Sequence, residues 1–261
     1  MSPRSYGRKV FVYTKGDLNR MKRLVVVGDI HGDLGAFKLV LKSVNLREDG
    51  LIFLGDYADR GPHGIEVIEG VESLIDKYSG NVVALKGNHE DYVDGEPNFM
   101  PCTLIAEVER KKGEWDVYFK RNLEPFLNSL YLAAVIPGWF LFVHGGISSK
   151  IKSLSDFESP EVEEDVLWSD PFDGYGEYPN RRGAGIEFGE DVTKEVCERL
   201  GVKSIIRSHQ PRKALEGPFY QHGRRVVTIS STSVYGGRPF VYILNLQNLE
   251  DVHYQFLDEL L

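Results

Sequence analysis

Three apolar segments of this chain end in glycine followed by aspartate or asparagine, and further polar residues follow each of them at once. The motifs are Gly-Asp-Ile-His-Gly at 28–32, Gly-Asp-Tyr-Ala-Asp-Arg-Gly at 55–61 and Gly-Asn-His-Glu at 87–90. The apolar runs before them, residues 24–27, 51–54 and 82–85, are continuous rather than alternating, which is typical of strands buried on both faces. Between the runs, apolar side chains recur at helical spacing. This order predicts a β-α-β-α-β unit, whose parallel strands bring all three motifs to one edge of a sheet.

Two further apolar runs lead to histidines. Residues 131–136 and 139–143 flank Pro137-Gly138, a favourable pair for a turn, so we expect a hairpin that ends at His144. A strand over 202–207 would end at His209. For the other segments we expect two helices over 102–130 separated at Gly113, an irregular stretch over 169–189, a helix over 191–200, and antiparallel strands at 225–230, 240–246 and 252–256.

Length and charge narrow the class of protein. The 261 residues favour a single domain, with a core over about 24–256 and an N-terminal extension over 1–23. A net charge of -8 argues against a nucleic-acid partner, and no stretch approaches the roughly 20 apolar residues of a membrane span. Only two cysteines are present, and residues 1–22 lack the apolar region of a secretory signal. We therefore expect a cytoplasmic protein without nucleic-acid or membrane partners.

The residues at the five strand ends form the ligand set of a two-metal hydrolase. Aspartate next to glycine is also an ordinary turn former, but five such ends in register point to a shared site. Carboxylate and amide oxygens combined with imidazole suit manganese, iron or zinc better than calcium, and we expect two divalent ions, with manganese preferred. Asp56, in the middle one of the three motifs, is the natural candidate for a carboxylate that bridges the two ions. The expected metal ligands are Asp29, His31, Asp56, Asn88, His144 and His209.

Other residues of the motifs suit proton transfer and phosphate binding. His89 follows a metal ligand directly, so we assign it to protonation of the leaving group, with Asp59 as the carboxylate that orients it. The alternative is that His89 is a further ligand or a loop histidine. Arg60 and, next, Arg182 are the best guanidinium groups for a phosphoryl group. We expect no catalytic role for the remaining polar residues considered, which are His63, His222 and His253, and a surface or ion-pair role for Arg181, Arg207 and Arg212.

With these motifs, the chain resembles the phosphoprotein phosphatase superfamily, and the likeness extends to Trp-Ser-Asp-Pro at 168–171. The resemblance implies an α/β fold in four layers, α/β/β/α, with a β-sandwich flanked by helices. It implies that Asp29, His31 and Asp56 bind one ion, that Asp56 bridges, and that the second ion is completed by Asn88, His144 and His209. Arg60, Arg182 and Asn88 would bind the phosphate. The implied reaction is direct attack of metal-bound water, without a phosphoenzyme.

One departure from the family concerns the segment near the C-terminus. Family members commonly have Ser-Ala-Pro-Asn-Tyr-Cys-Gly, where this chain has Ser-Thr-Ser-Val-Tyr-Gly-Gly at 231–237, so only Tyr235 is left to line the pocket. The leading hypothesis is a serine/threonine protein phosphatase that acts on phosphoproteins, with phosphotyrosine as a secondary substrate. The alternatives are a symmetrical dinucleoside tetraphosphate hydrolase and a non-catalytic phosphoprotein-binding module.

Overall fold

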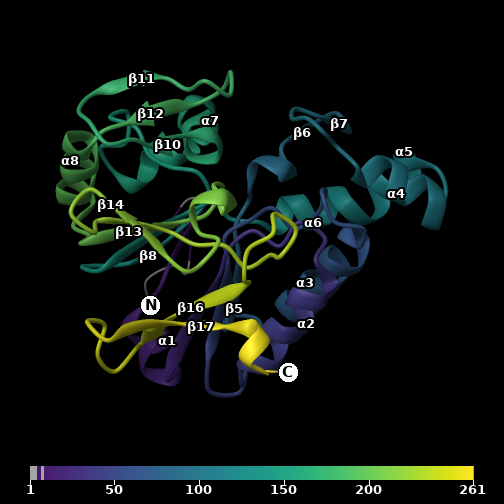
Figure 1. Ribbon diagram of the computed structural model, residues 1–261, viewed down its shortest axis with the longest axis horizontal. Helices are drawn as coiled ribbons and strands as arrows, with labels where there is room; N and C mark the ends of the chain where they lie inside the picture. Colours follow the sequence, from purple (N-terminus) through teal and green to yellow (C-terminus); the bar gives the residue numbers. More distant parts are fainter. Residues whose placement is uncertain (1–4, 7–8, 261) are drawn as a thin grey trace.

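Two β-sheets pack face to face in the centre of the protein, and helices cover the outer face of each (Figure 1). The computed structural model describes residues 5–6 and 9–260. Helices α2 and α3 cover one sheet, while α7 and α8 cover the other. The predicted four-layer α/β/β/α arrangement is confirmed. The helices are α1 (Lys15–Arg20), α2 (Leu34–Ser43), α3 (Gly64–Lys77), α4 (Leu104–Lys111), α5 (Trp115–Tyr118), α6 (Glu124–Ser129), α7 (Pro160–Trp168) and α8 (Glu190–Leu200).

The first sheet has five strands in the order β17-β16-β3-β4-β5. Strands β3, β4 and β5 are parallel and are joined by α2 and α3, which confirms the predicted β-α-β-α-β unit. Strand β16 runs antiparallel to β3 and joins β17 to the sheet. The bounds are β3 (Arg23–Val27), β4 (Gly50–Phe53), β5 (Val82–Ala84), β16 (Phe240–Asn245) and β17 (Val252–Phe256).

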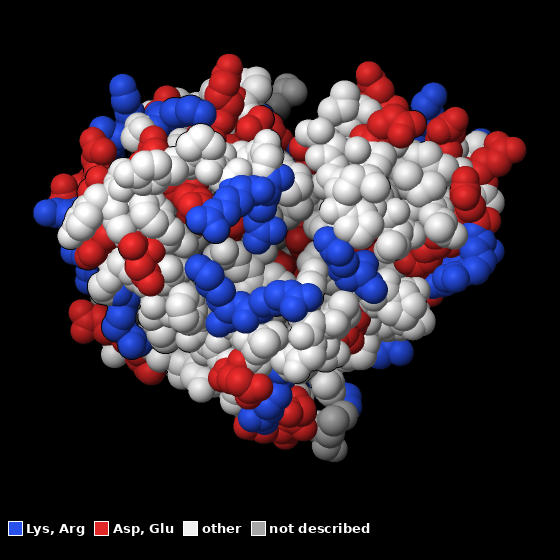
Figure 2. Space-filling model, turned by 45° about the horizontal axis from the view of Figure 1, so that its top comes forward, with Lys and Arg blue, Asp and Glu red and all other residues white. Residues whose placement is uncertain are grey.

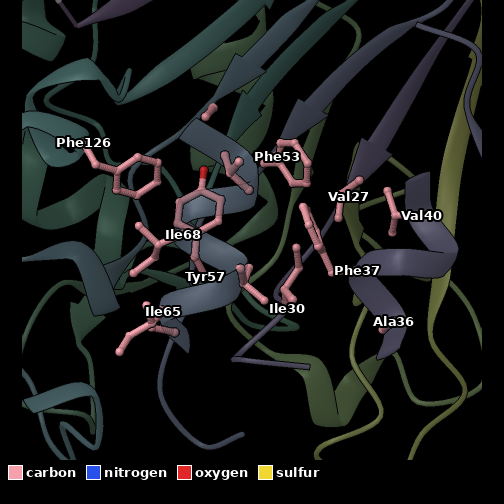
Figure 3. Packing of buried hydrophobic residues seen from close by; sticks show 14 of the residues in the cluster. Val27, Ile30, Ala36, Phe37, Val40, Phe53, Tyr57, Ile65, Ile68 and Phe126 are labelled. Atoms are coloured by element: carbon pink, nitrogen blue, oxygen red, sulfur yellow. The ribbon is translucent and has the colours of Figure 1, made fainter. Parts of the chain in front are cut away.

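Alternate residues of these strands face two different cores. Val25 and Val27 of β3 pack with the helices α2 and α3, and Figure 3 shows Val27 and Phe53 beside Phe37 of α2. Leu24 and Val26, one residue out of phase, pack against the second sheet. Both faces of the strand are therefore buried, and this is why the apolar run is continuous rather than alternating.

The second sheet has seven strands in the order β1-β2-β8-β9-β13-β15-β14. The hairpin predicted around Pro137-Gly138 is present, because β8 pairs antiparallel with β9 and Gly138 adopts a φ of 84°. Strand β13 lies parallel to β9, so both strands deliver their last residues to the same edge. The bounds are β1 (Ser5–Tyr6), β2 (Val10–Val12), β8 (Ala133–Ile136), β9 (Phe140–Val143), β13 (Ser204–Arg207), β14 (Phe219–Gln221) and β15 (Val226–Thr228).

The packed core begins before residue 24, where we expected an extension. Strand β2 pairs parallel with β8, and Val10 and Phe11 are buried. Helix α1 then starts at a capping box, in which Thr14 and Asp17 satisfy each other's backbone N–H groups. Residues 1–4 and 7–8 of the expected extension lie outside the described residues.

Two other segments differ from the prediction. Residues 169–189, expected to be irregular, contain a small three-stranded sheet of β10 (Asp170–Pro171), β12 (Ile186–Phe188) and β11 (Glu177–Pro179). Strand β15 was expected to be antiparallel to its neighbours, but it lies parallel to β13 as well as antiparallel to β14. Periodicity in a single strand does not specify which partner it finds, because pairing depends on segments distant in sequence.

The helical segment over 102–130 is confirmed, with the break at Gly113, whose φ is 104°. A π-helical turn over Phe119–Leu123 joins α5 to α6. The short hairpin β6 (Tyr92–Val93) and β7 (Glu96–Pro97) precedes these helices, and both lie on the upper right in Figure 1. Among the described residues, no helix combines the length and the hydropathy needed to cross a membrane.

Candidate active site

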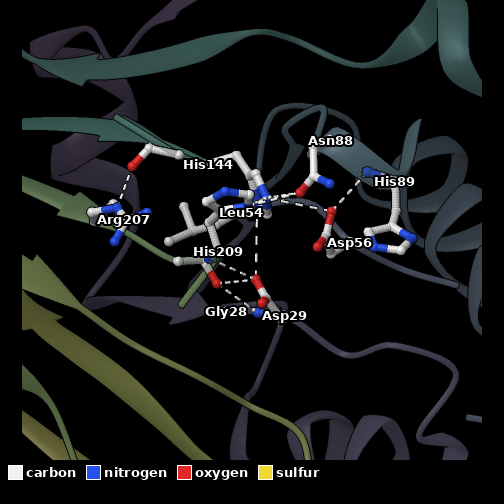
Figure 4. Close-up of polar contacts among 12 residues, drawn as sticks. Gly28, Asp29, Leu54, Asp56, Asn88, His89, His144, Arg207 and His209 are labelled. Carbon is white, nitrogen blue, oxygen red and sulfur yellow. Dashed lines mark hydrogen bonds and ion pairs between the residues drawn. The ribbon is translucent and has the colours of Figure 1, made fainter. Parts of the chain in front are cut away.

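The six side chains expected to bind metal come together at the edge where strands of both sheets end. Figure 4 labels five of them, Asp29, Asp56, Asn88, His144 and His209. Asp29 and His31 follow β3, Asp56 follows β4, and the 3₁₀ turn Asn88–Glu90 follows β5. His144 and His209 follow β9 and β13 of the other sheet. The site is therefore assembled across the sandwich, from five stretches of the chain.

One group of donor atoms surrounds the Nε2 atom of His144. This nitrogen lies 3.0 Å from Asn88 Oδ1, 3.1 Å from His209 Nδ1 and 3.4 Å from Asp56 Oδ1. His209 Nδ1 is also 2.8 Å from Asn88 Oδ1. Four side chains thus direct nitrogen or oxygen atoms at one small space.

A second group lies on the other side of Asp56. His31 Nε2 is 3.4 Å from Asp56 Oδ2 and 3.7 Å from Asp29 Oδ2. The two oxygens of Asp56 therefore face different groups, Oδ1 towards His144 and Oδ2 towards His31. This is the arrangement that a carboxylate needs in order to bridge two ions.

Backbone carbonyls orient the two imidazoles that face Asp56. His31 Nδ1 lies 3.0 Å from the carbonyl of Ala58, and His144 Nδ1 lies 2.9 Å from that of Leu54. A carbonyl only accepts hydrogen bonds, so each Nδ1 carries the hydrogen and each Nε2 presents a lone pair to the site. Burial, reinforced by nearby His89, lowers the pKa of His31 to about 3, and burial also lowers the pKa of His144 well below its ordinary value. Both rings are therefore uncharged at neutral pH, and each can offer its Nε2 lone pair to a metal ion.

The donor atoms repel one another unless a cation lies between them. Burial, together with the nearby carboxylates of Asp29 and Glu90, raises the pKa of Asp56 well above its usual value. Among the described residues, the buried Asp29 Oδ2 and His209 Nε2 have no hydrogen-bond partner. Lone pairs that converge without hydrogens between them fit divalent metal ions of the borderline type. The residues present therefore fit the expected metal centre.

Two residues that the sequence analysis did not assign hold the ligands in place. Glu90, in the same motif as Asn88, accepts N–H groups of Asp56 and Gly87 at 2.8 Å and that of Tyr57 at 3.0 Å. Ser208 donates its hydroxyl to Asp29 Oδ1, which also accepts the His209 amide at 3.0 Å. The position of Glu90 inside a motif was a usable signal, and so was the position of Ser208 directly before the expected ligand His209.

The ligands sit on unusual backbone. Of the eight non-glycine residues with positive φ in the described part of the chain, five belong to the site: His31, Asp56, Asp59, Arg60 and His209. Such conformations are costly for residues with a Cβ, and they concentrate at functional sites. Gly55, with φ 105°, is needed because a Cβ there would lie 2.5 Å from the Cα of Gly87. Gly145, which follows the ligand His144, packs against the backbone of Leu167.

His89 lies beside this cluster and contacts the carboxylate expected for it. Its Nδ1 is 2.8 Å from Asp59 Oδ2, and both side chains are buried. Burial raises the pKa of Asp59, but hydrogen bonds from His89 and from the amides of Leu104 and Thr103 outweigh it, so the net pKa lies below the usual value. Atoms of His31, Asp56 and His89 lie within 4.8 Å of one another, so distance alone also permits His89 as a ligand.

The two arginines expected to bind phosphate lie nearer the surface than Asn88, which is buried. Arg60 is exposed, and Arg182 is held by Asp170, with 2.7 Å between Nε and Oδ2. Tyr235 reaches the cluster, with its hydroxyl 3.3 Å from His31 Nε2. Figure 2 shows a hollow on this side of the molecule, with acidic atoms at its floor and basic side chains on both flanks.

Arg207 is an ion-pair residue but not a surface residue. Its side chain is fully buried, donates to the Gly145 carbonyl and lies 3.0 Å from Asp170 Oδ1. Asp170 thus joins Arg207 to Arg182, and its Oδ1 is 4.0 Å from His209 Nε2. Within the described part of the chain, His63, His222 and His253, for which no catalytic role was expected, make no hydrogen bond or ion pair with the six proposed metal ligands. For example, His222 bonds to Thr193 and Phe172.

Comparison with known proteins agrees with this geometry. Residues 22–213 match the calcineurin-like phosphoesterase family. A serine/threonine-protein phosphatase of Caenorhabditis elegans is 31% identical over 239 residues, which cover 87% of this chain and 51% of that protein. The serine/threonine-protein phosphatase rdgC of Drosophila melanogaster is 34% identical over 244 residues, which cover 82% of this chain and 35% of that protein. The chain thus spans about half, or about a third, of the length of these relatives.

A solved structure shows the same fold. It is a serine/threonine phosphatase from Saccharomyces cerevisiae, described as similar to human phosphatase PP5, and it aligns with a TM-score of 0.75 at 22% identity. The alignment covers 92% of this chain and 77% of the yeast chain. With the family match extending over most of the sequence, this chain belongs to the calcineurin-like phosphoesterase family.

Proposed function

We propose that this protein is a metal-dependent serine/threonine protein phosphatase that hydrolyses phosphomonoesters. The observation that carries the proposal is the position of Asp56, whose two oxygens face two separate donor groups, with the buried His89–Asp59 pair alongside. Two donor groups that share one carboxylate suit phosphate ester hydrolysis, because both the attacking and the leaving oxygen need charge stabilisation.

The metal centre is assigned to six residues and two divalent ions. The first ion would be held by Asp29, His31 and Asp56, and the second by Asp56, Asn88, His144 and His209. When bound, such ions supply Lewis-acid stabilisation of the phosphoryl oxygens and lower the pKa of water. Manganese is the preferred identity, with iron or zinc as the alternatives.

The chain's own residues then bind the phosphate and move a proton. Arg60 and Arg182 donate to the phosphoryl oxygens, with the Asn88 amide, and Tyr235 lines the pocket. His89 gives a proton to the departing oxygen of serine or threonine. Asp59 contacts His89 Nδ1 and so orients the ring, while Asp59 itself stays ionised, as its lowered pKa requires.

Phosphoproteins are the proposed substrates, with phosphotyrosine as a secondary one. The names of the C. elegans and D. melanogaster relatives support this choice. The open hollow in Figure 2 is consistent with access for a polypeptide. A single domain over residues 1–261 and a cytoplasmic location stay predictions from the sequence.

Substrate comparison tests the proposal. The purified protein, with manganese added or removed by a chelator, is given a phosphoserine peptide, a phosphotyrosine peptide and diadenosine tetraphosphate. We expect metal-dependent release of phosphate that is fastest from the phosphoserine peptide. Preferential cleavage of the dinucleotide would instead assign a small-molecule phosphoesterase. Binding of the peptide without hydrolysis, in protein that contains two ions, would assign a binding module.

A further inference from the structure

Helix α4 lies against the loop over residues 59–64, which follows the second motif, and contacts it at three points. The N-terminal amides of the helix, a buried carboxylate one turn later and a lysine one turn beyond that all bond to this loop or to the start of α3. The residues that make these contacts are Thr103, Leu104, Glu107 and Lys111. None of them belongs to the motifs of the proposed function.

The first contact joins α4 to the proposed proton-donor pair. Asp59 Oδ1 accepts the amide of Thr103 at 2.5 Å and that of Leu104 at 2.8 Å, while Asp59 Oδ2 faces His89 Nδ1. The first amides of a helix have no partner within the helix, so Asp59 satisfies them. The carboxylate that orients His89 is therefore itself oriented by α4.

The second contact runs in the opposite direction. Glu107 of α4 is buried, and its Oε2 accepts the amide of Gly64 at 3.0 Å, while its Oε1 accepts that of Ile65 at 3.3 Å. These are the first two amides of α3. The N-terminus of each helix is thus capped by a carboxylate that the helix itself does not supply. Asp59, in the loop before α3, caps α4, and Glu107 of α4 caps α3.

The third contact fixes Glu107. Lys111 Nζ lies 2.7 Å from Glu107 Oε1 and 3.2 Å from the Pro62 carbonyl, and it also pairs with Glu66 of α3 at 2.8 Å. The packing leaves little freedom, because a Cβ on Gly64 would lie 3.1 Å from Glu107 Oε2 and 2.8 Å from the Ala58 Cβ. Both ends of the loop are consequently tied to one helix.

We propose that Glu107 is a positioning residue for the Asp59–His89 pair. This inference rests on the proposed function. Without the Glu107 carboxylate, α3 loses its cap, and α4 is no longer held in register with the 59–64 loop. The amides of Thr103 and Leu104 then move relative to Asp59, and His89 loses its orientation towards the leaving oxygen. A displacement of about 1 Å in such a group costs about 100-fold in rate.

The readout that separates positioning from plain destabilisation is the dependence on the leaving group. A p-nitrophenolate leaves without a proton, whereas a serine alkoxide needs one, so only the second reaction depends strongly on His89. We therefore expect Glu107→Ala to lower kcat on a phosphoserine peptide by about 10- to 100-fold and kcat on p-nitrophenyl phosphate by less than about threefold. Glu107→Gln keeps one acceptor oxygen. We expect it to lower kcat on the peptide by a smaller factor and to leave kcat on p-nitrophenyl phosphate unchanged.

The matched control is Asp156→Ala, which also removes a carboxylate that accepts two backbone amides, those of Lys152 and Ser153, each at 2.8 Å. We expect it to leave the ratio of the two activities unchanged. All variants are tested in the full chain, with metal content and urea unfolding measured alongside, so that loss of folded protein is corrected for. If Glu107→Ala does not fold, the same ratio is measured on Glu107→Gln.

Two results would overturn the inference: an equal loss on both substrates by the folded variants, or no loss on the peptide. Failure of the proposed function looks different, because the unaltered protein would then hydrolyse the dinucleotide or the aryl phosphate but no phosphopeptide. In that case glycerol 2-phosphate replaces the peptide as the alkyl ester, and the ratio for Glu107→Ala still decides whether Glu107 positions His89.

Discussion

The two halves of the candidate active site are built in different ways. The carboxylate and imidazole half is buried: Asp29 and His144 are 0% exposed and Asp56 is 2% exposed. The arginine half is open, with Arg60 exposed and the Arg182 side chain 40% exposed. Atoms that repel one another must be fixed by the fold, through partners such as Glu90 and backbone carbonyls. The two guanidinium groups are held less closely: Asp170 orients Arg182, and we expect a bound phosphate to supply the charge that orders Arg60.

The largest effect on activity is expected for Asp56→Asn, because Asp56 faces both donor groups of the buried half. Each Asp56 oxygen faces one donor group, so the substitution removes the charge that would serve both ions. We expect both ions to be lost together and hydrolysis of every phosphoester to fall to background. Element analysis of the purified variant, beside assays on p-nitrophenyl phosphate, checks this. A variant that keeps two ions at full occupancy would show that Asp56 does not bridge.

The next largest effect is expected for His89→Asn, which leaves the six proposed ligands intact. General acid catalysis contributes about 10²–10⁴-fold, so kcat on a phosphoserine peptide should fall by that factor while metal content is unchanged. The aryl phosphate should lose much less. If the variant loses its metal instead, His89 is a ligand, as the short distances to His31 and Asp56 allow.

Glu90→Gln tests whether the buried half depends on the backbone around it. The substitution turns one acceptor oxygen into an NH₂ group that faces amide donors of Asp56, Tyr57 or Gly87. We expect the free energy of unfolding to fall by about 1–3 kcal/mol. Metal affinity should fall about 10- to 100-fold. Urea unfolding and metal titration measure the two effects, with Asp191→Asn, at a surface carboxylate that accepts the Gly176 amide, as the control.

The smallest effect is expected in the open half, and it differs between the two arginines. Arg182 is already oriented by Asp170, whereas the described structure shows no ion pair for Arg60. A lysine cannot serve both Asp170 and a phosphate, so Arg182→Lys should raise the KM for a phosphopeptide about 10-fold, equivalent to about 1.4 kcal/mol. Arg60→Lys should raise it less. Steady-state kinetics on one peptide compare the two, and equal effects would mean that the ion pair with Asp170 contributes nothing.

The parts of the fold that could be predicted are those that local pattern specifies. The continuous apolar runs identified β3, β4 and β5, because only strands buried on both faces lack alternation. Pro137-Gly138 identified a hairpin, since proline fixes φ and glycine accepts the positive φ of the turn. The small sheet over residues 169–189 was missed because its strands are two or three residues long and depend on each other for pairing. The role of residues 10–12 was missed because their partner, β8, lies about 120 residues further on.

The chemistry of the site shows the same division. The sequence by itself determined which side chains stand at strand ends, and parallel topology then required the first three motifs to meet at one edge. It did not determine that Ser208 and Glu90 hold the ligands, that Arg207 is buried against Asp170, or that α4 and α3 cap each other through Asp59 and Glu107. Those contacts join residues far apart in the chain, and only the packing of two sheets and their helices decides which distant donor meets which acceptor.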